Sequence, residues 1–152
     1  MSDPATSVDP AAVPGVEPPG YARASLAGVL PAVATSLGVT GYADDGLVAA
    51  LPPARRAVVV LVDGLGERLL RRRGGHAPFL RSLLPTGQSL VCGYPSTTAT
   101  SMGSFGTGLP PGSHGLVGYE VLDPGTDAVF NELSWTDGPD PRSWQPEPTV
   151  FE

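Results

Sequence analysis

A single carboxylate directly follows the most apolar run of the sequence. The run Ala57–Val62 (AVVVLV) lies between Arg56 and Asp63, and a continuous β-branched stretch of this length predicts a buried strand, parallel to its neighbours. Ligands of open α/β sheets bind at the carboxyl ends of the strands, and a carboxylate suits a divalent cation. Asp63 is therefore a candidate metal ligand. The alternative is an aspartate that caps the next helix through Gly64 and Leu65.

Five hydroxyl side chains occur within the six residues Ser96–Ser101 (STTATS), directly after a proline. We expect a strand to lead here into a helix that begins at Thr98. A hydroxyl at a helix N-terminus lies beside free N–H groups that can hold a phosphate oxygen. A nearby metal would lower its pKa and make it a nucleophile. The alternative interpretation is an ordinary Ser or Thr helix cap.

Other motifs are weaker. A dinucleotide-binding loop at Gly64–Gly66 is disfavoured, because the third glycine of the motif would fall at Leu69 and no acidic residue follows about 20 positions later. A Walker loop is excluded because the sequence has no lysine. We expect His114 to be a turn histidine bonded to the backbone, with metal ligation as the alternative. We expect His76 to be exposed and Cys92 to lie in the core.

Alternating strands and helices should position these side chains. The apolar spacing predicts helices over residues 24–37, 67–73, 77–84 and from 98 to 105, and strands over 57–62 and 88–92, with a strand or hairpin after residue 114. This order predicts an α/β fold with a mainly parallel sheet flanked by helices. Residues 1–20 are rich in proline and predict a flexible leader. The length of the chain argues for one domain at most.

Composition limits the classes of function. The 152-residue chain has a formal net charge of −6, which argues against a nucleic-acid-binding protein. Yet residues 52–119 hold seven arginines against Asp63 and Glu67, which suits an anionic substrate; the alternative is a solvated helix face. A single cysteine excludes an internal disulfide. No signal peptide or membrane-spanning run is visible, so we expect a cytoplasmic protein that does not bind a membrane.

Three segments taken together resemble a known family. They are Val62–Gly66 (VDGLG), Tyr94–Ala99 (YPSTTA) and Thr107–Leu116 (TGLPPGSHGL). In this order they resemble the type I phosphodiesterase/nucleotide pyrophosphatase family of the alkaline phosphatase superfamily, and residues 77–87 resemble a helix of that family. The resemblance covers roughly residues 24–122. It implies an alkaline phosphatase-like fold, a small-molecule phosphate ester or nucleotide as substrate, and two zinc ions.

The resemblance also implies roles for individual residues. Asp63 matches the family's metal-binding aspartate, and Thr98 matches its metal-bound nucleophile, with Thr97 as the alternative if the register shifts by one. In such a mechanism Thr98 attacks phosphorus, and a zinc-bound hydroxide hydrolyses the covalent intermediate. Ser101 takes the place of a phosphate-contacting asparagine and could donate a hydrogen bond in its stead.

The family's further Asp and His ligands have no counterpart in this sequence. Asp63 and Thr98 would supply two ligands, whereas zinc takes three or four from protein. We therefore expect residues 21–152 to be the N-terminal part of an alkaline phosphatase-like domain, truncated before the two-metal site is complete. The alternatives are a phosphomonoesterase or phosphomutase of the same superfamily, or a non-catalytic chain that binds a partner.

Overall fold

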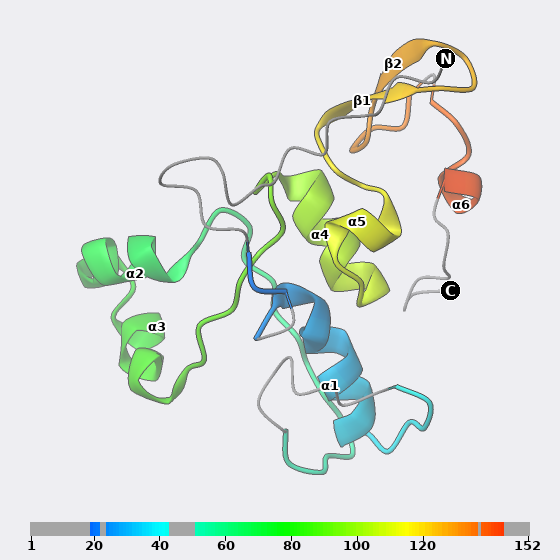
Figure 1. Ribbon diagram of the computed structural model, residues 1–152. Helices are drawn as coiled ribbons and strands as arrows, with labels where there is room; N and C mark the ends of the chain where they lie inside the picture. Colours follow the sequence, from blue (N-terminus) through cyan, green and yellow to red (C-terminus); the bar gives the residue numbers. More distant parts are fainter. Residues whose placement is uncertain (1–18, 22–23, 43–50, 137, 145–152) are drawn as a thin grey trace.

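The computed structural model describes residues 19–21, 24–42, 51–136 and 138–144. Figure 1 shows a central group of helices, an arm formed by α2 and α3 on one side, and a β-hairpin with α6 on the other. The elements are α1 (Val29–Ser36), α2 (Glu67–Arg73), α3 (Pro78–Leu83), α4 (Thr98–Thr107), α5 (Pro111–His114), α6 (Pro141–Trp144), β1 (Glu120–Asp123) and β2 (Ala128–Asn131). Short 3-10 helices cover Leu26–Gly28, Gly74–His76 and Leu84–Thr86.

Helix α4 is the centre of the core. It contacts α1, the 3-10 helix before α1, and α5, and six of its ten residues are buried. Gly103 allows the close approach to α5, because a Cβ at this position would lie 2.8 Å from both the His114 ring and the Leu116 side chain. The helix ends at Thr107, and its C-cap is Gly108, whose φ of +72° favours glycine.

The predicted helices are confirmed. The expected helix over residues 24–37 is a 3-10 turn followed by α1, and Gly38 follows it with a φ of +81°. Helix α2 has the predicted bounds, the helix expected over 77–84 is α3, and α4 begins at Thr98 as predicted. No described helix has the length and apolar character needed to cross a membrane.

The hairpin expected after His114 is also present. Strands β1 and β2 pair antiparallel, with Glu120 opposite Asn131 and Asp123 opposite Ala128. The Asp123 carboxylate stabilises the turn by accepting hydrogen bonds from the Gly125 N–H (2.8 Å) and the Thr126 hydroxyl (2.9 Å). Behind β2, the rings of Phe130, Trp135 and Trp144 pack with centroids 5.1–6.5 Å apart.

The prediction of a buried strand over Ala57–Val62 is wrong in this structure. The segment forms no strand, and Val58 and Val60 are 90% and 77% exposed. A strand needs a neighbour for its backbone groups, and no backbone hydrogen bond joins residues 57–61 to another described segment. Within the described ranges the only sheet is the antiparallel hairpin, so a parallel sheet is not seen there.

Two smaller expectations also change. The strand expected over 88–92 is reduced to one parallel bridge between Val91 and Ser25. Cys92 is exposed rather than part of the core, because it lies on the wall of a cavity. Most of the expected leader, residues 1–18, lies outside the described residues.

Candidate active site

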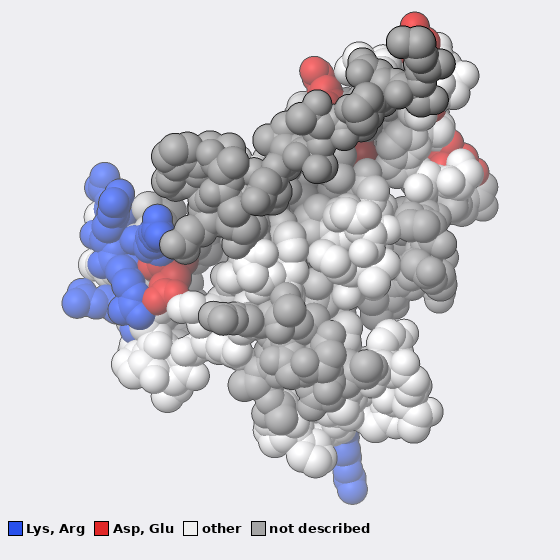
Figure 2. Space-filling view, in the orientation of Figure 1, with Lys and Arg blue, Asp and Glu red and all other residues white. Residues whose placement is uncertain are grey.

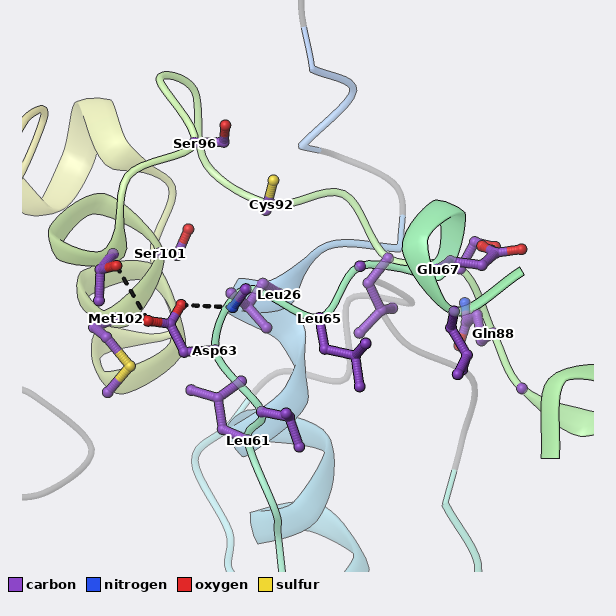
Figure 3. Close-up of a pocket in the computed structure, with 18 of the residues that line it drawn as sticks. Leu26, Leu61, Asp63, Leu65, Glu67, Gln88, Cys92, Ser96, Ser101 and Met102 are labelled. Atoms are coloured by element: carbon purple, nitrogen blue, oxygen red, sulfur yellow. Dashed lines mark hydrogen bonds between the residues drawn. The ribbon is translucent and has the colours of Figure 1, made fainter. Parts of the chain in front are cut away.

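A cavity of about 810 Å³ lies between the arm and the N-terminal end of α4. The residues expected to carry the chemistry, Asp63, Thr98 and Ser101, all line it. Figure 3 shows Asp63 beside Ser101 and Met102 of α4, with Glu67 across the cavity. Segments separated by about 35 positions in the sequence are therefore brought to one site.

Asp63 connects the two sides of this site. Its Oδ1 accepts a hydrogen bond from the Gly64 N–H at 2.9 Å, and its Oδ2 accepts one from the Thr98 hydroxyl at 3.3 Å. The N-cap position of α2 is Gly66, so Asp63 does not cap that helix. Gly64 makes the turn possible with a φ of +68°, and the carboxylate is thereby directed toward α4.

The neighbouring threonines at the start of α4 have different contacts. Thr97 is the N-cap: its hydroxyl accepts from the Thr100 N–H at 3.3 Å and donates to the Thr100 hydroxyl at 2.9 Å. Thr98 instead donates to Asp63 within the cavity. The helix-cap interpretation therefore describes Thr97, whereas the role of Thr98 as a nucleophile stays a prediction.

A buried histidine supports the α4 wall from behind. His114 is fully buried, its Nδ1 accepts from the Leu116 N–H at 3.0 Å, and its Nε2 lies 3.0 Å from the Ser104 hydroxyl. Because Nδ1 accepts, the neutral ring carries its proton on Nε2 and donates it to Ser104. Burial lowers the pKa of His114 to about 4. The expectation of a turn histidine bonded to the backbone is confirmed, and His114 does not line the cavity.

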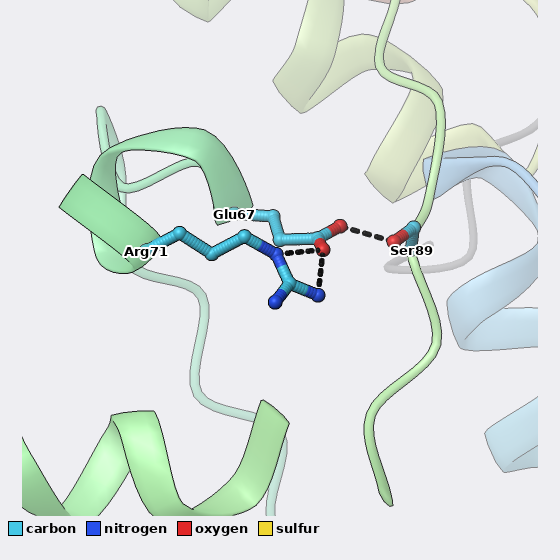
Figure 4. Close-up of polar contacts among 3 residues, drawn as sticks. All are labelled: Glu67, Arg71 and Ser89. Atoms are coloured by element: carbon cyan, nitrogen blue, oxygen red, sulfur yellow. Dashed lines mark hydrogen bonds and ion pairs between the residues drawn. The ribbon is translucent and has the colours of Figure 1, made fainter. Parts of the chain in front are cut away.

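The opposite wall holds polar residues that the sequence analysis missed. Glu67 accepts from Arg71 Nε at 2.6 Å, lies 2.5 Å from Arg71 Nη2, and also accepts a hydrogen bond from Ser89 (Figure 4). The Ser89 and Arg71 contacts hold the pKa of Glu67 below its usual value. The Glu67–Arg71 spacing of four residues is a recognisable helix pair, but no local pattern predicts the contact with Ser89.

The described residues supply an incomplete set of metal ligands. No group of three or more His, Cys, Asp or Glu side chains in these ranges could hold a metal ion. Asp63 and Thr98 together offer two oxygen ligands, fewer than the three or four that zinc takes from protein. The residues in hand therefore do not fit a zinc site by themselves, and we assign no catalytic step to a metal.

Comparison with known proteins identifies the family. No solved structure matches the chain. The sequence model of the type I phosphodiesterase / nucleotide pyrophosphatase family matches residues 57–152, which is more than half of the chain and includes every residue named on the α4 and arm sides of the cavity. This family implies an alkaline phosphatase-like fold, of which the described residues show a small α/β part. The chain belongs to the type I phosphodiesterase / nucleotide pyrophosphatase family.

Proposed function

We propose that this protein hydrolyses phosphate diesters or pyrophosphates of small molecules, with Thr98 as the nucleophile. The observation that carries the proposal is the Thr98–Asp63 hydrogen bond inside the cavity. It orients one hydroxyl of the Ser96–Ser101 cluster, while its neighbour Thr97 is engaged in capping the helix. Family membership supports the reaction class.

The chemistry proceeds in two displacements. The Thr98 oxygen bonds to phosphorus, the bond to the leaving group breaks, and the hydroxyl proton passes to the Asp63 carboxylate that accepts its hydrogen bond. The departing oxygen takes this proton from Asp63. Water then attacks the phosphothreonine ester: its oxygen bonds to phosphorus, the bond between phosphorus and the Thr98 oxygen breaks, and a water proton passes to the Thr98 oxygen, which releases the phosphorylated product and restores the hydroxyl. Ser101 lies one helical turn along the same cavity wall and is proposed to donate a hydrogen bond to a phosphate oxygen.

Zinc is the metal that the family resemblance implies. Asp63 and Thr98 would be two of its ligands, and a bound metal would stabilise negative charge on the phosphoryl oxygens. A complete site needs donors beyond the described residues.

The decisive experiment traps the covalent intermediate. The purified protein is incubated with a chromogenic phosphate diester, with zinc and separately with EDTA, then acid-quenched and analysed by peptide mass spectrometry. We expect the phosphoryl adduct on Thr98. The Thr98→Ala variant should lose at least 99% of turnover, on the order of the 10²-fold or greater contribution of a catalytic group, whereas Thr98→Ser should retain part of it. An adduct on Thr97, or turnover in Thr98→Ala above a tenth of wild type, would overturn the assignment.

The same assay separates the alternatives. A preference for monoesters would identify a phosphomonoesterase, and transfer of the phosphoryl group to an added alcohol instead of water would identify a phosphomutase-like reaction. Absence of turnover with every substrate, with or without metal, would favour a chain that binds a partner without catalysis.

A further inference from the structure

We propose that Ala57–Val62, the segment that leads into Asp63, is an interaction surface for a second copy of this chain. The two copies pair through this segment as a two-stranded antiparallel sheet, in which Arg55 of each copy lies opposite Asp63 of the other. The second copy thereby contributes a positive charge to the candidate active site. The inference does not depend on the proposed reaction.

The segment presents a continuous apolar surface. Every residue from Arg55 to Asp63 is exposed. Val58 and Val60 are 90% and 77% exposed, and the other valine and leucine side chains of the segment are between 41% and 50% exposed. Contiguous apolar side chains on the surface of a protein mark sites of interaction. A partner that covers this segment would therefore remove a large apolar area from water.

The backbone of the segment is available for pairing. Residues 57–61 make no backbone hydrogen bond to another segment among the described residues. Figure 1 shows the chain here between α1 and α2, outside any helix or strand. Four of the six residues of Ala57–Val62 are valines, which favour a strand when a neighbour is present. Unpaired backbone groups in such a segment are a template for pairing with another chain.

The charges at the two ends of the segment indicate which partner fits. Arg55 and Arg56 precede the apolar run, and Asp63 follows it. When two copies pair antiparallel, the arginine end of one copy lies beside the aspartate end of the other. A parallel pairing in register would instead place like charges next to one another, which is unfavourable. The segment is therefore complementary to itself in the antiparallel direction.

Two-fold symmetry defines the register of this pairing. In a closed antiparallel dimer one residue lies opposite its own copy on the symmetry axis. With Val59 on the axis, Arg55 lies directly opposite Asp63 at both ends of the pairing. If the axis moved to Val60, Ala57 would lie opposite Asp63 and both charge pairs would be lost. The register centred on Val59 is therefore the one that we propose.

The described part of the chain offers Asp63 no cationic partner of its own. Five of the nine arginines belong to α2 and α3, and Figure 2 shows basic side chains gathered there. Neither these arginines nor Arg55 form an ion pair with Asp63 within the described ranges. Arginine binds carboxylates well because its planar guanidinium donates parallel hydrogen bonds. Since Asp63 lines the cavity with Thr98, the proposed pair lies beside the candidate nucleophile.

Sedimentation of the full chain over a range of concentrations tests the association. We expect the mass to rise from 15.6 kDa toward twice this value. Arg55→Glu places like charges opposite each other twice in the dimer and should weaken it at least about ten-fold. The matched control Arg56→Glu changes the net charge equally but lies opposite Val62, and it should weaken the dimer less than about three-fold. Addition of Asp63→Arg to Arg55→Glu should restore the association.

Three outcomes of this measurement would overturn the proposal. A monomer at every concentration would show that no second copy binds, and protection of the amides of residues 57–62 in that monomer would assign the surface to another segment of the same protein. Growth beyond the dimer would indicate open stacking of strands. Equal losses in Arg55→Glu and Arg56→Glu would show that the charge pair does not hold the copies together.

Cysteine cross-linking tests the register. In a Cys92→Ser background, Val59→Cys should form a disulfide-linked dimer under mild oxidation, because opposite Cα atoms of an antiparallel pair lie about 4.5–5.5 Å apart. Val60→Cys should not, since its two copies are offset by two positions along the strands. Both positions are exposed, so neither change should disturb the fold. Cross-linking of both variants, or of Val60→Cys alone, would contradict the proposed pairing.

Discussion

The two walls of the cavity are built in different ways. The α4 wall is backed by buried residues: Thr100 and His114 are fully buried, and Gly103 lets the helices approach closely. The arm wall has no buried residue in α2 or α3, and its polar contacts lie at the surface. The proposed nucleophile therefore lies on tightly packed helices, while the charged groups opposite lie on helices exposed to solvent. Substitutions in the α4 wall should therefore lower the free energy of unfolding more than matched substitutions in the arm wall.

The largest expected difference concerns glycine substitution. Gly103→Val places side-chain atoms where a Cβ alone would lie 2.8 Å from His114 and Leu116, and overpacking of this kind should lower the free energy of unfolding by about 3 kcal/mol. In the matched change in the arm, Gly75→Val, the added Cβ would meet no atom within 4 Å, and the substitution should change the free energy of unfolding by less than about 0.5 kcal/mol. Urea denaturation measures both. Equal losses would show that the two walls are equally packed.

Low pH should destabilise the fold, because it protonates the buried His114 behind the α4 wall. The pKa of this histidine in the fold, about 4, lies below its ordinary value of 6.5, so the fold favours the neutral ring. The contribution of the neutral His114 ring to the free energy of unfolding is complete above pH 6.5 and is lost as the pH falls toward 4. Linkage predicts a loss of about 2 kcal/mol between pH 7.5 and pH 5. The measurement is the urea midpoint against pH, with His114→Gln as the control that should lack this part of the pH dependence. An identical profile in the two proteins would contradict the prediction.

A smaller effect is expected at the start of α4. Thr97→Ala removes the hydroxyl that accepts from the Thr100 N–H and should cost about 1 kcal/mol of stability, whereas Thr97→Ser keeps the cap and should restore most of it. Helix α2 has no side-chain cap at Gly66. Thermal unfolding followed by circular dichroism measures the difference between the two variants. If Thr97→Ala has no effect, the hydroxyl does not stabilise the helix.

The smallest effect is expected in the arm. Glu67→Gln removes the charge that pairs with Arg71, but exposed ion pairs contribute little to stability. The melting temperature should therefore stay within the error of the measurement, and the same holds for Arg71→Gln. A fall in melting temperature as large as that of Thr97→Ala would show that the Glu67–Arg71 pair stabilises the arm. It would contradict the contrast between the two walls.

The helices of both walls could be predicted from the sequence, because their signals are local. The spacing of apolar residues predicts the bounds of α2, and the hydroxyl cluster predicts the start of α4 at Thr98. Asp63 and Thr98 were singled out by residue type and by the family motifs, and the structure brings them to hydrogen-bonding distance. Local sequence patterns were sufficient to predict the helices, because helical hydrogen bonds join residues that are close in the sequence.

The failures share a physical cause, since they depend on what lies next to a segment in space. Ala57–Val62 has the composition of a buried strand, but composition does not supply the neighbour that a strand requires. Cys92 is expected in the core, yet it is exposed on the wall of a cavity. The contact of Glu67 with Ser89 joins positions 22 residues apart, and no local spacing rule predicts a contact across that separation.

The exposed segment Ala57–Val62 has a mechanical consequence for the site, because it leads directly into Asp63. Residues 57–61 make no backbone hydrogen bond to another segment among the described residues; a chain of this kind is a template for a neighbouring strand, and a neighbour would set the twist of the segment. The direction in which the Asp63 carboxylate leaves the chain would change with that twist, and with it the 3.3 Å separation from Thr98. A strand that pairs with these six residues would therefore change the contact between Asp63 and the Thr98 hydroxyl.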